Sequence, residues 1–333
     1  MKIAILISSY DGSQVQFRDL DPEYDPSPYL PADECTVFRI LKATAVRQVS
    51  DIARRGFDVI INLCDGALDE DRAGIEVVRT LERMDIAFTG AGAAFYDPTR
   101  EAMKMACHAA GLLFPAYVMA REPADVDRAL ACLRFPLLVK HPHGYSSLGL
   151  TRDSRVTHTD ALRRETARTI GQFGAALIEE FIEGREFTVL VTEPRDEHEP
   201  AWVLTPVEFC FPAGETFKHF DLKWKEFARM ETRAVTDTAL VARLADIAGR
   251  TFTALGGSGY GRCDLRMDKS GAIYVLEINP NCAVFYPPGQ FGSADFILSH
   301  DPAGHRGFLD HLLRRAARRR DRRQSVSAER SDT

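Results

Sequence analysis

The chain has 333 residues, of which 45% are hydrophobic and 27% charged, so it can bury a sizeable core and divide into two or three α/β units. Its formal net charge is −6 at pH 7, and this acidic balance argues against nucleic acid as the main partner. The seven cysteines include no CxxC pair, and neither a signal peptide nor an apolar run of membrane-spanning length is recognisable, so we expect reduced thiols, a cytoplasmic location and no membrane partner.

The first part of the chain alternates apolar strands with helices. Apolar runs predict strands at 3–7, 36–41, 57–63 and 86–89, and helical spacing predicts helices at 43–55 and 75–84. In the first helix we expect Val46, Val49 and Ile52 to face inward. Strands that are apolar throughout are typical of parallel sheets, so we predict a βαβ domain over residues 1–97. Residues 18–31 contain four prolines and predict a long loop, either over a site or on the surface.

Two further α/β units are predicted. In the unit at 98–185, Pro98 and Gly111 mark the ends of a helix at 100–110, followed by strand 117–120, helix 123–133, strand 137–140, helix 160–173 and strand 176–179. The unit at 186–311 contains strands at 189–192 and 203–209, a helix at 238–255, and a hairpin of strands 265–267 and 273–276.

The hairpin carries a candidate metal site. Antiparallel pairing brings Asp264, at the start of its first strand, close to Glu277, at the end of its second. Asn279 returns to the face of Glu277 because side chains alternate along a strand. Oxygen ligands of this kind suit Mg²⁺, which takes its remaining ligands from water and phosphates. The alternative is a solvated hairpin with ordinary surface charges, because both motifs are short.

Two earlier segments offer groups for a nucleotide. An apolar strand ends in Lys140 and is followed by a turn rich in glycine and serine, which can present N–H groups and hydroxyls to phosphate oxygens. Further on lie Glu179, Glu180, Glu183 and Glu186. One of these carboxylates could hold a ribose, and amides at the strand edge could bind adenine. By itself this second segment is an acidic connector.

Seven segments follow one another along the chain: INLCDG, DIAFTGAG, PTREAMKMACHAAGL, PLLVKHPHGYSSLG, LIEEFIEGREFTV, FDLKW, and GYGRCD with LEINPN. Taken together and in this order, they resemble the ATP-grasp superfamily and, within it, the D-alanine–D-alanine ligase family. The resemblance extends from residue 2 to about residue 283. It implies an α/β ATP-grasp fold, in which an N-terminal βαβ (pre-ATP-grasp) domain precedes two α/β subdomains that clamp ATP.

The resemblance also implies site residues. The groups for the phosphates are Arg100, Lys140, Ser146, Ser147 and Lys223; those for adenine are Glu179, Glu180 and Ile182; and Glu186 is the group for ribose. Arg100 stands where the family usually has lysine, with Lys104 one turn later. Asp264, Glu277 and Asn279 are implied as ligands of two Mg²⁺ ions, with Mn²⁺ as an alternative. Arg262, Lys223 and Ser146 are the implied catalytic residues, although Arg262 could instead serve only as a partner of Asp264.

The implied reaction is a ligation of two small molecules. The γ-phosphoryl group of ATP is transferred to a carboxylate, and an amine attacks the resulting acylphosphate to give an amide, ADP and phosphate. A phosphotransferase that acts on a small-molecule acceptor is the alternative, and a non-catalytic nucleotide-binding protein is a third reading, against which the intact set of site residues argues. A homodimer is left open.

The resemblance weakens where the family binds its amino acids. The segments SSYDGSQV, NLCDGALDED and NPNCAVFYPPG differ from the family's usual patterns. Ala283 replaces a glycine of the oxyanion site, and Tyr286, Pro287 and Pro288 fill the acceptor region. We therefore expect an acid or acceptor other than D-alanine. A cationic amine could bind to the charged loop that contains Asp65, Asp69, Glu70 and Asp71, or that loop could simply be solvated.

The last 22 residues, 312–333, carry eight arginines against three acidic residues. Such a tail is typical of the frayed and solvated end of a last helix, so we expect it to be disordered. An arm that binds polyanions is the alternative.

Overall fold

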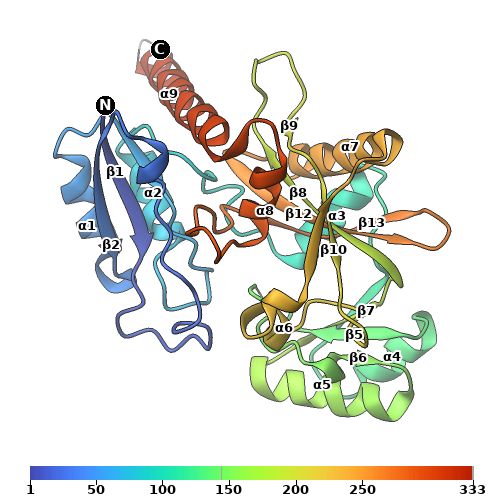
Figure 1. Cartoon of the computed structure of the whole chain (residues 1–333). Helices are drawn as coiled ribbons and strands as arrows, with labels where there is room; N and C mark the ends of the chain where they lie inside the picture. Colours follow the sequence, from blue (N-terminus) through green and yellow to red (C-terminus); the bar gives the residue numbers. More distant parts are fainter. Residues whose placement is uncertain (144, 332–333) are drawn as a thin grey trace.

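Three β-sheets and the helices that cover them make up the fold. The computed structural model describes residues 1–143 and 145–331. One sheet lies in each of the predicted units 1–97, 98–185 and 186–311, except that β8 of the central sheet begins two residues earlier, at Gly184, and we propose this division for the folding units. Figure 1 shows the N-terminal sheet beside the central one, and the sheet of the unit at 98–185, called the second sheet below, lies beneath them.

The N-terminal sheet is parallel, with the strand order β2-β1-β3. Its elements are β1 (Lys2–Ser8), β2 (Glu34–Ile40), α1 (Ala45–Ala53), β3 (Val59–Asn62) and α2 (Ile75–Arg83). The predicted βαβ pattern is confirmed, and Val49 and Ile52 are buried. Val46 was wrongly predicted to face inward, since it is 50% exposed. The predicted strand at 86–89 is also wrong: in these described residues only an isolated bridge forms, between Phe88 and Ile60.

The second sheet is antiparallel, with the order β4-β7-β5-β6. This part of the chain contains α3 (Arg100–Ala109), β4 (Tyr117–Ala120), α4 (Asp125–Cys132), β5 (Leu137–Lys140), β6 (Arg155–Val156), α5 (Thr159–Phe173) and β7 (Ala176–Glu180). Helices α4 and α5 cover its outer face (Figure 1). Helix α3 begins after Thr99, whose hydroxyl accepts a hydrogen bond from the N–H of Ala102 at 3.1 Å.

The central sheet has the order β11-β10-β8-β12-β13, and β9 also pairs with β8. Its elements are β8 (Gly184–Thr192), β9 (Trp202–Val203), β10 (Val207–Cys210), α6 (Phe220–Trp224), β11 (Glu231–Ala234), α7 (Thr238–Ala254), β12 (Tyr260–Asp268) and β13 (Ile273–Pro280). Helix α7 packs on β8, β12 and β13. The predicted strand at 203–209 is divided into β9 and β10, and Pro206, which has no N–H to donate, lies in the break.

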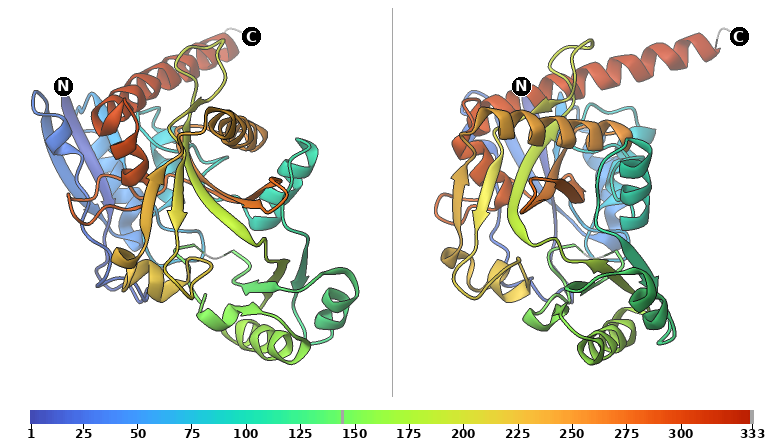
Figure 2. Two further views of the ribbon diagram at one scale, coloured as in Figure 1. Left: turned by 45° about the vertical axis from the view of Figure 1, so that its right-hand side comes forward. Right: turned by 90° about the vertical axis from the view of Figure 1, so that its right-hand side faces the viewer.

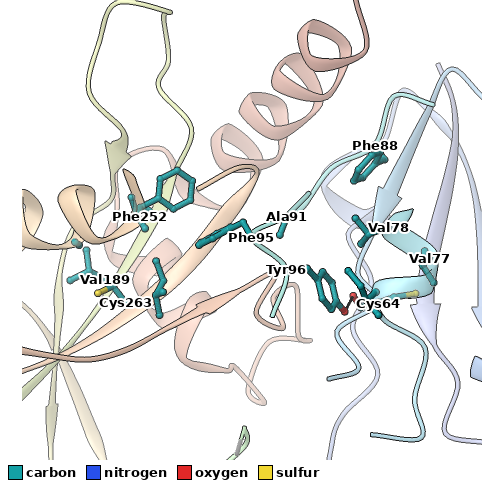
Figure 3. Close-up of a cluster of buried hydrophobic side chains, with 14 of the residues drawn as sticks. Cys64, Val77, Val78, Phe88, Ala91, Phe95, Tyr96, Val189, Phe252 and Cys263 are labelled. Atoms are coloured by element: carbon teal, nitrogen blue, oxygen red, sulfur yellow. Dashed lines mark hydrogen bonds between the residues drawn. The ribbon is translucent and has the colours of Figure 1, made fainter. Parts of the chain in front are cut away.

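The hydrophobic core extends without interruption from the N-terminal sheet to the central one. Figure 3 shows Ala91, Phe95 and Tyr96 between the two. The ring of Phe95 packs edge-on against Phe252 of α7, with centroids 5.1 Å apart, and the Tyr96 hydroxyl donates to the carbonyl of Cys64 at 2.8 Å. Because residues 91–96 contact helix α7 on one side and the chain just after β3 on the other, they connect the N-terminal sheet to the central one.

Of the two C-terminal helices, α8 (Ser293–His300) packs on the central sheet and on α9, and α9 (Gly304–Ser331) returns to the N-terminal domain, where it contacts β3. The expectation of a disordered tail from residue 312 is wrong for its first turns, because Leu312 and Ala316 are buried in the core beside strands β1 and β3. Arg319 donates to the carbonyls of Gly90 and Phe88 at 2.9 and 2.7 Å. The helix then extends beyond the body of the protein (Figure 2). Within 1–143 and 145–331 we find no helix of sufficient length and apolarity to cross a membrane.

The packing of α9 makes a prediction about stability. Leu309 of α9 is fully buried, so Leu309→Ala should lower the free energy of unfolding by about 2 to 5 kcal/mol through the cavity it leaves. Val46→Ala, at an exposed helix position, should change it by less than about 0.5 kcal/mol. Denaturant titration checks both values. Equal effects of the two variants would show that α9 is not part of the core.

Candidate functional site

A cavity of about 770 Å³ lies where the three sheets meet. Its walls come from loops of the N-terminal domain, from β5 and β7 of the second sheet, from β12 and β13, and from the segment around α6. Every residue to which the sequence assigned a role with nucleotide, metal or catalysis lines this cavity. The fold therefore brings the predicted residues together in one cavity, and the contacts among them indicate what each group could do.

The hairpin places its carboxylates opposite each other, as predicted. Asp264 of β12 pairs with Glu277 of β13, and Arg262 pairs with Asn279. The side-chain amide of Asn279 lies 3.3 Å from a carboxylate oxygen of each acid, which brings all three side chains to one place. Among the described residues no three His, Cys, Asp or Glu side chains gather as a metal site. The candidate set is thus two carboxylates and one amide.

Arginines flank both carboxylates of the hairpin. Arg262 forms two hydrogen bonds with Asp264, at 3.0 and 2.8 Å, so the pairing that was the alternative reading of Arg262 is present. Arg100, at the start of α3, forms an ion pair with Glu277. Burial acts to raise the pKa of Glu277, but Arg100, Lys140 and Arg262 outweigh burial and lower the pKa to about 2. Glu277 is therefore ionised at neutral pH.

Two lysines lie next to this pair. Lys140, at the end of β5, forms an ion pair with Glu179, and Lys104 of α3 lies 3.0 Å from the other oxygen of the same carboxylate. Burial acts to raise the pKa of Glu179, but Lys104 and Lys140 outweigh burial and lower it to about 2. Burial and the charge of Arg100 lower the pKa of Lys140 to about 8, against the opposing effect of Glu179. Glu179 was expected at adenine, yet its carboxylate is occupied by these two lysines.

The expected adenine and ribose groups lie on the same side of the cavity. The N–H of Glu180 donates to the carbonyl of Ala116 at 2.9 Å, and its side chain contacts Arg134 at the surface. Ile182 lines the cavity. Glu186 is buried with Arg266 at 3.9 Å, and burial raises its pKa, which Arg266 partly offsets.

The loop with Ser146 and Ser147 is fixed against α6. Both serines have positive φ, 54° and 57°, an uncommon backbone conformation for residues other than glycine. The hydroxyl of Ser147 donates to the carbonyl of Lys218 at 2.9 Å, and the indole N–H of Trp224 donates to the carbonyl of Ser146 at 2.9 Å. These bonds hold the serines at the cavity wall, beside Lys223.

Lys223 and Lys218 add two more cations. Burial, with Arg262 and Lys218 close by, lowers the pKa of Lys223 to about 7. Burial also lowers the pKa of Lys218, against the opposing effects of Glu186 and Asp264. The sequence analysis missed Lys218, because it lies two residues before the FDLKW motif and outside the segments that were singled out.

The N-terminal domain contributes a second acidic group, which the sequence analysis also missed. Asp21 lies in the proline-rich loop at 18–31, so the prediction of a loop over the site is confirmed by its position in the cavity wall. Its carboxylate accepts hydrogen bonds from the hydroxyls of Tyr10 and Tyr286, the latter at 2.5 Å. Burial and the nearby charge of Asp65 raise the pKa of Asp21.

The acids of the charged loop after β3 are mostly paired within the N-terminal domain. Of its four described acids only Asp65 lines the cavity. Asp65 accepts from the buried Arg72 at 2.7 Å, and Glu70 forms an ion pair with the same arginine. Asp71 accepts from the hydroxyl of Ser13 at 2.6 Å. In the predicted acceptor region, Ala283 and Tyr286 line the cavity, whereas Pro287 and Pro288 are not among its described lining residues.

Comparison with known proteins places this geometry in a family. Residues 107–284 match the family model described as "D-ala D-ala ligase C-terminus". The D-alanine–D-alanine ligase of Ralstonia pickettii is 29% identical over 278 residues, which cover 82% of this chain and 78% of that protein. The corresponding ligase of Chromohalobacter salexigens is 30% identical over 244 residues, which cover 71% of this chain and 69% of that protein.

Solved structures share the fold over almost the whole chain. The Bacillus anthracis D-alanine–D-alanine ligase complexed with ATP has a TM-score of 0.69 and 18% identity, covering 97% of this chain and 99% of its own. The VanG D-Ala:D-Ser ligase of Enterococcus faecalis has a TM-score of 0.72 and 16% identity, covering 95% of this chain and 99% of its own. At these identities the likeness establishes the fold alone.

The low pKa of Lys223 makes a prediction about pH. At pH 8 its amine is mainly neutral in the free protein, and phosphate oxygens would favour the charged form, so binding of an ATP analogue should take up a proton. The affinity should then fall by up to about tenfold per pH unit as the pH rises above about 7. Calorimetric titration from pH 7 to pH 9 measures this slope.

Two variants separate Lys223 from the other cations. Lys223→Met should weaken binding at pH 7 and remove the slope between pH 7 and about 8, because the group that titrates there is lost. Lys140, whose pKa is about 8, should still titrate at higher pH in this variant. Lys269→Met, at the exposed turn of the hairpin, should leave both the affinity and the pH profile unchanged. A full slope between pH 7 and 8 in Lys223→Met would assign that titration to another group.

Proposed function

The chain belongs to the D-alanine–D-alanine ligase family of ATP-grasp enzymes, and we propose that it joins the carboxylate of an amino acid to an amine. As an ATP-dependent ligase it uses ATP, and we infer that an acylphosphate is its intermediate. The observation that carries this proposal is the meeting of four cations, Arg100, Lys140, Lys223 and Arg262, with two facing carboxylates in one cavity. Phosphoryl transfer depends mainly on such positioning and charge neutralisation.

Glu179 serves the nucleotide indirectly in this proposal. Because its carboxylate lies between Lys104 and Lys140, it fixes the Lys140 ammonium where phosphate oxygens can reach it, rather than contacting adenine. Arg100 and the serine loop complete the phosphate site. Adenine then takes the apolar part of the cavity beside Ile182 and Phe181, and Glu186 accepts from a ribose hydroxyl.

Asp264, Glu277 and Asn279 fit Mg²⁺ by the chemistry of their donor atoms. Each offers oxygen, the ligand that Mg²⁺ prefers, and the low pKa of Glu277 keeps its carboxylate ionised. We propose that these three residues hold the Mg²⁺ that accompanies ATP. The metal would supply neutralisation of phosphate charge. Arg262, bonded to Asp264, lies where it can share that charge.

Asp21 supports an amino acid as the acid substrate. Its carboxylate faces the cavity between two tyrosine hydroxyls, with Asp65 nearby, so an ammonium group is a suitable ligand. An ammonium held there is protonated and cannot attack an acylphosphate. The molecule bound to Asp21 therefore reacts through its own carboxylate, and the amine comes from a second substrate.

The reaction then follows from the positions of the cations. A carboxylate oxygen of the amino acid forms a bond to the γ-phosphorus, and the bond to the β,γ-bridging oxygen breaks to leave ADP. Lys223 and Arg262 offset the charge on the transferred group. The neutral amine of the second substrate attacks the acyl carbon, phosphate leaves, and the amine loses a proton to the departing phosphate or to water.

Aromatic contacts close the cavity against water during this sequence. Phe17 of the N-terminal loop stacks on Trp224 at the end of α6, with centroids 4.9 Å apart, and Tyr145 packs edge-on against Phe17. A closed site protects an acylphosphate from hydrolysis.

The curated relatives are ligases, so the phosphotransferase alternative finds no support.

The metal proposal predicts a sharp effect of one amide substitution. Glu277→Gln should lower Mg²⁺-dependent formation of ADP and phosphate by about 10²-fold or more, because a neutral amide cannot offset the charge of the ion as a carboxylate does. The measurement is ADP and phosphate release with a panel of amino acids as acid and amine.

Glu231→Gln is the matched control, since Glu231 is exposed on β11 of the same sheet. It should retain the full rate, and both variants should keep the thermal unfolding midpoint to within a few degrees. Near wild-type Mg²⁺-dependent turnover by Glu277→Gln would remove Glu277 from the metal site.

A further inference from the structure

Three phenylalanines form an apolar wall in a part of the cavity to which we assign no group of ATP. We call Phe227, Phe291 and Phe296 the aromatic wall. They come from three segments: Phe227 follows α6, Phe291 precedes α8, and Phe296 lies within α8. All three line the cavity and are only partly buried. Phe296 stacks on Phe227 with centroids 5.7 Å apart and meets Phe291 edge-on at 5.9 Å.

Tyr286 connects the aromatic wall to Asp21, the residue proposed above to bind the ammonium group of the amino acid, and we call Asp21 the ammonium site. The Tyr286 hydroxyl donates a hydrogen bond to Asp21, and one edge of the Tyr286 ring lies against Gly292, the residue after Phe291. A Cβ atom at Gly292 would lie 2.8 Å from two ring atoms of Tyr286, so the backbone there is as close to the ring as a glycine allows. An amino acid held by Asp21 therefore has Phe291 within its neighbourhood.

A buried carboxylate fixes the loop that carries these groups. Asp295 of α8 is fully buried and accepts hydrogen bonds from the backbone N–H groups of Phe285 and Gly292, at 2.8 and 3.2 Å. His305 lies 2.9 Å from the same carboxylate. Because both ends of the loop at 285–292 are bonded to one side chain, Tyr286 and Phe291 keep their positions relative to each other.

Further apolar side chains line the cavity near the aromatic wall. Met230 and Ala228 line it beside Phe227, and Leu20 and Pro22 line it on either side of Asp21. Phe291 also packs at a tilt against the ring of His305, with centroids 5.6 Å apart. Partly exposed phenyl rings facing a cavity gain free energy when an apolar group covers them.

We propose that the amino acid activated by this enzyme has an aromatic or large aliphatic side chain, which lies against the aromatic wall while Asp21 holds its ammonium group. This inference rests on the proposed ligase function and on Asp21 as the ammonium site. A methyl side chain has too little apolar surface to cover three rings, whereas a benzyl group has enough to cover them. The three rings thus select the size of the side chain, and the carboxylate of Asp21 selects an ammonium group on the same molecule.

Binding of free amino acids tests this assignment. The full chain, saturated with Mg²⁺ and a non-hydrolysable ATP analogue, is titrated in a calorimeter with each enantiomer of phenylalanine and of alanine. We expect one enantiomer of phenylalanine to bind about 10- to 100-fold more tightly than either alanine, as burial of a phenyl group predicts. Equal or tighter binding of alanine, or no binding of phenylalanine, would overturn the assignment.

Variants of the wall locate the effect. Phe291→Ala and, independently, Phe227→Ala should remove most of the preference for phenylalanine and leave alanine binding unchanged. Phe38→Ala, which alters a partly buried ring outside the cavity, should keep the preference. Affinity for the ATP analogue should be unchanged in all three, which reports that each variant is folded. An equal loss for phenylalanine and alanine in both wall variants would contradict a side-chain site.

Turnover separates this inference from the ligase function itself. Formation of ADP and free phosphate with alanine and an amine, but not with phenylalanine, would overturn the aromatic preference and leave the ligase intact. Formation of ADP with the phosphoryl group retained on the amino acid would instead overturn the ligase function. Free phosphate produced fastest with phenylalanine is the result that supports both.

Discussion

The site depends on the compensation of buried cations by buried carboxylates. Glu179 holds Lys104 and Lys140, and Glu277 holds Arg100. An isolated charge removed from water is costly, and removal of one member of such a pair leaves the other uncompensated. The two acids therefore keep the cations charged and in place within a cavity where they would otherwise repel one another. A polyphosphate chain that enters the cavity adds negative charge beside groups that are already oriented to receive it.

The rest of the fold positions these two acids and their partners. Residues on antiparallel strands face each other at fixed spacing, so the pairing of β12 with β13 sets Asp264 against Glu277. Arg100 and Lys104 are four residues apart on α3, which places them on one face of the helix. The segment that contains Phe95 and Tyr96 packs on both neighbouring sheets. Loops of the N-terminal domain thereby line the same cavity as Arg100, Lys140 and Lys223.

Periodicity explains which parts could be predicted from the sequence. Antiparallel pairing and side-chain alternation could place the residues of the hairpin, and an apolar run marked the strand that ends in Lys140. The roles of Arg100, Ser146 and Lys223 were instead implied by the resemblance to the family. Asp21, Lys218 and Phe291 lie in irregular segments, where no repeat indicates which way a side chain points. Contacts between residues far apart in sequence also give no local signal; for example, Asp21 accepts a hydrogen bond from Tyr286, 265 residues later. Val46 was wrongly expected to be buried, and the first turns of α9 were wrongly expected to be disordered. Periodicity alone does not show which face of a helix is covered by another element.

The acylphosphate is tested most directly by isotope transfer from the acid substrate. An amino acid with ¹⁸O in both carboxylate oxygens is turned over with ATP and an amine, and the released phosphate is examined by ³¹P NMR. Activation of the carboxylate by ATP predicts one ¹⁸O atom in each phosphate, because the bond that breaks last joins the acyl carbon to an oxygen that came from the acid. Phosphate without label, or a phosphoryl group that stays on the product, would contradict carboxylate activation and with it the ligase mechanism.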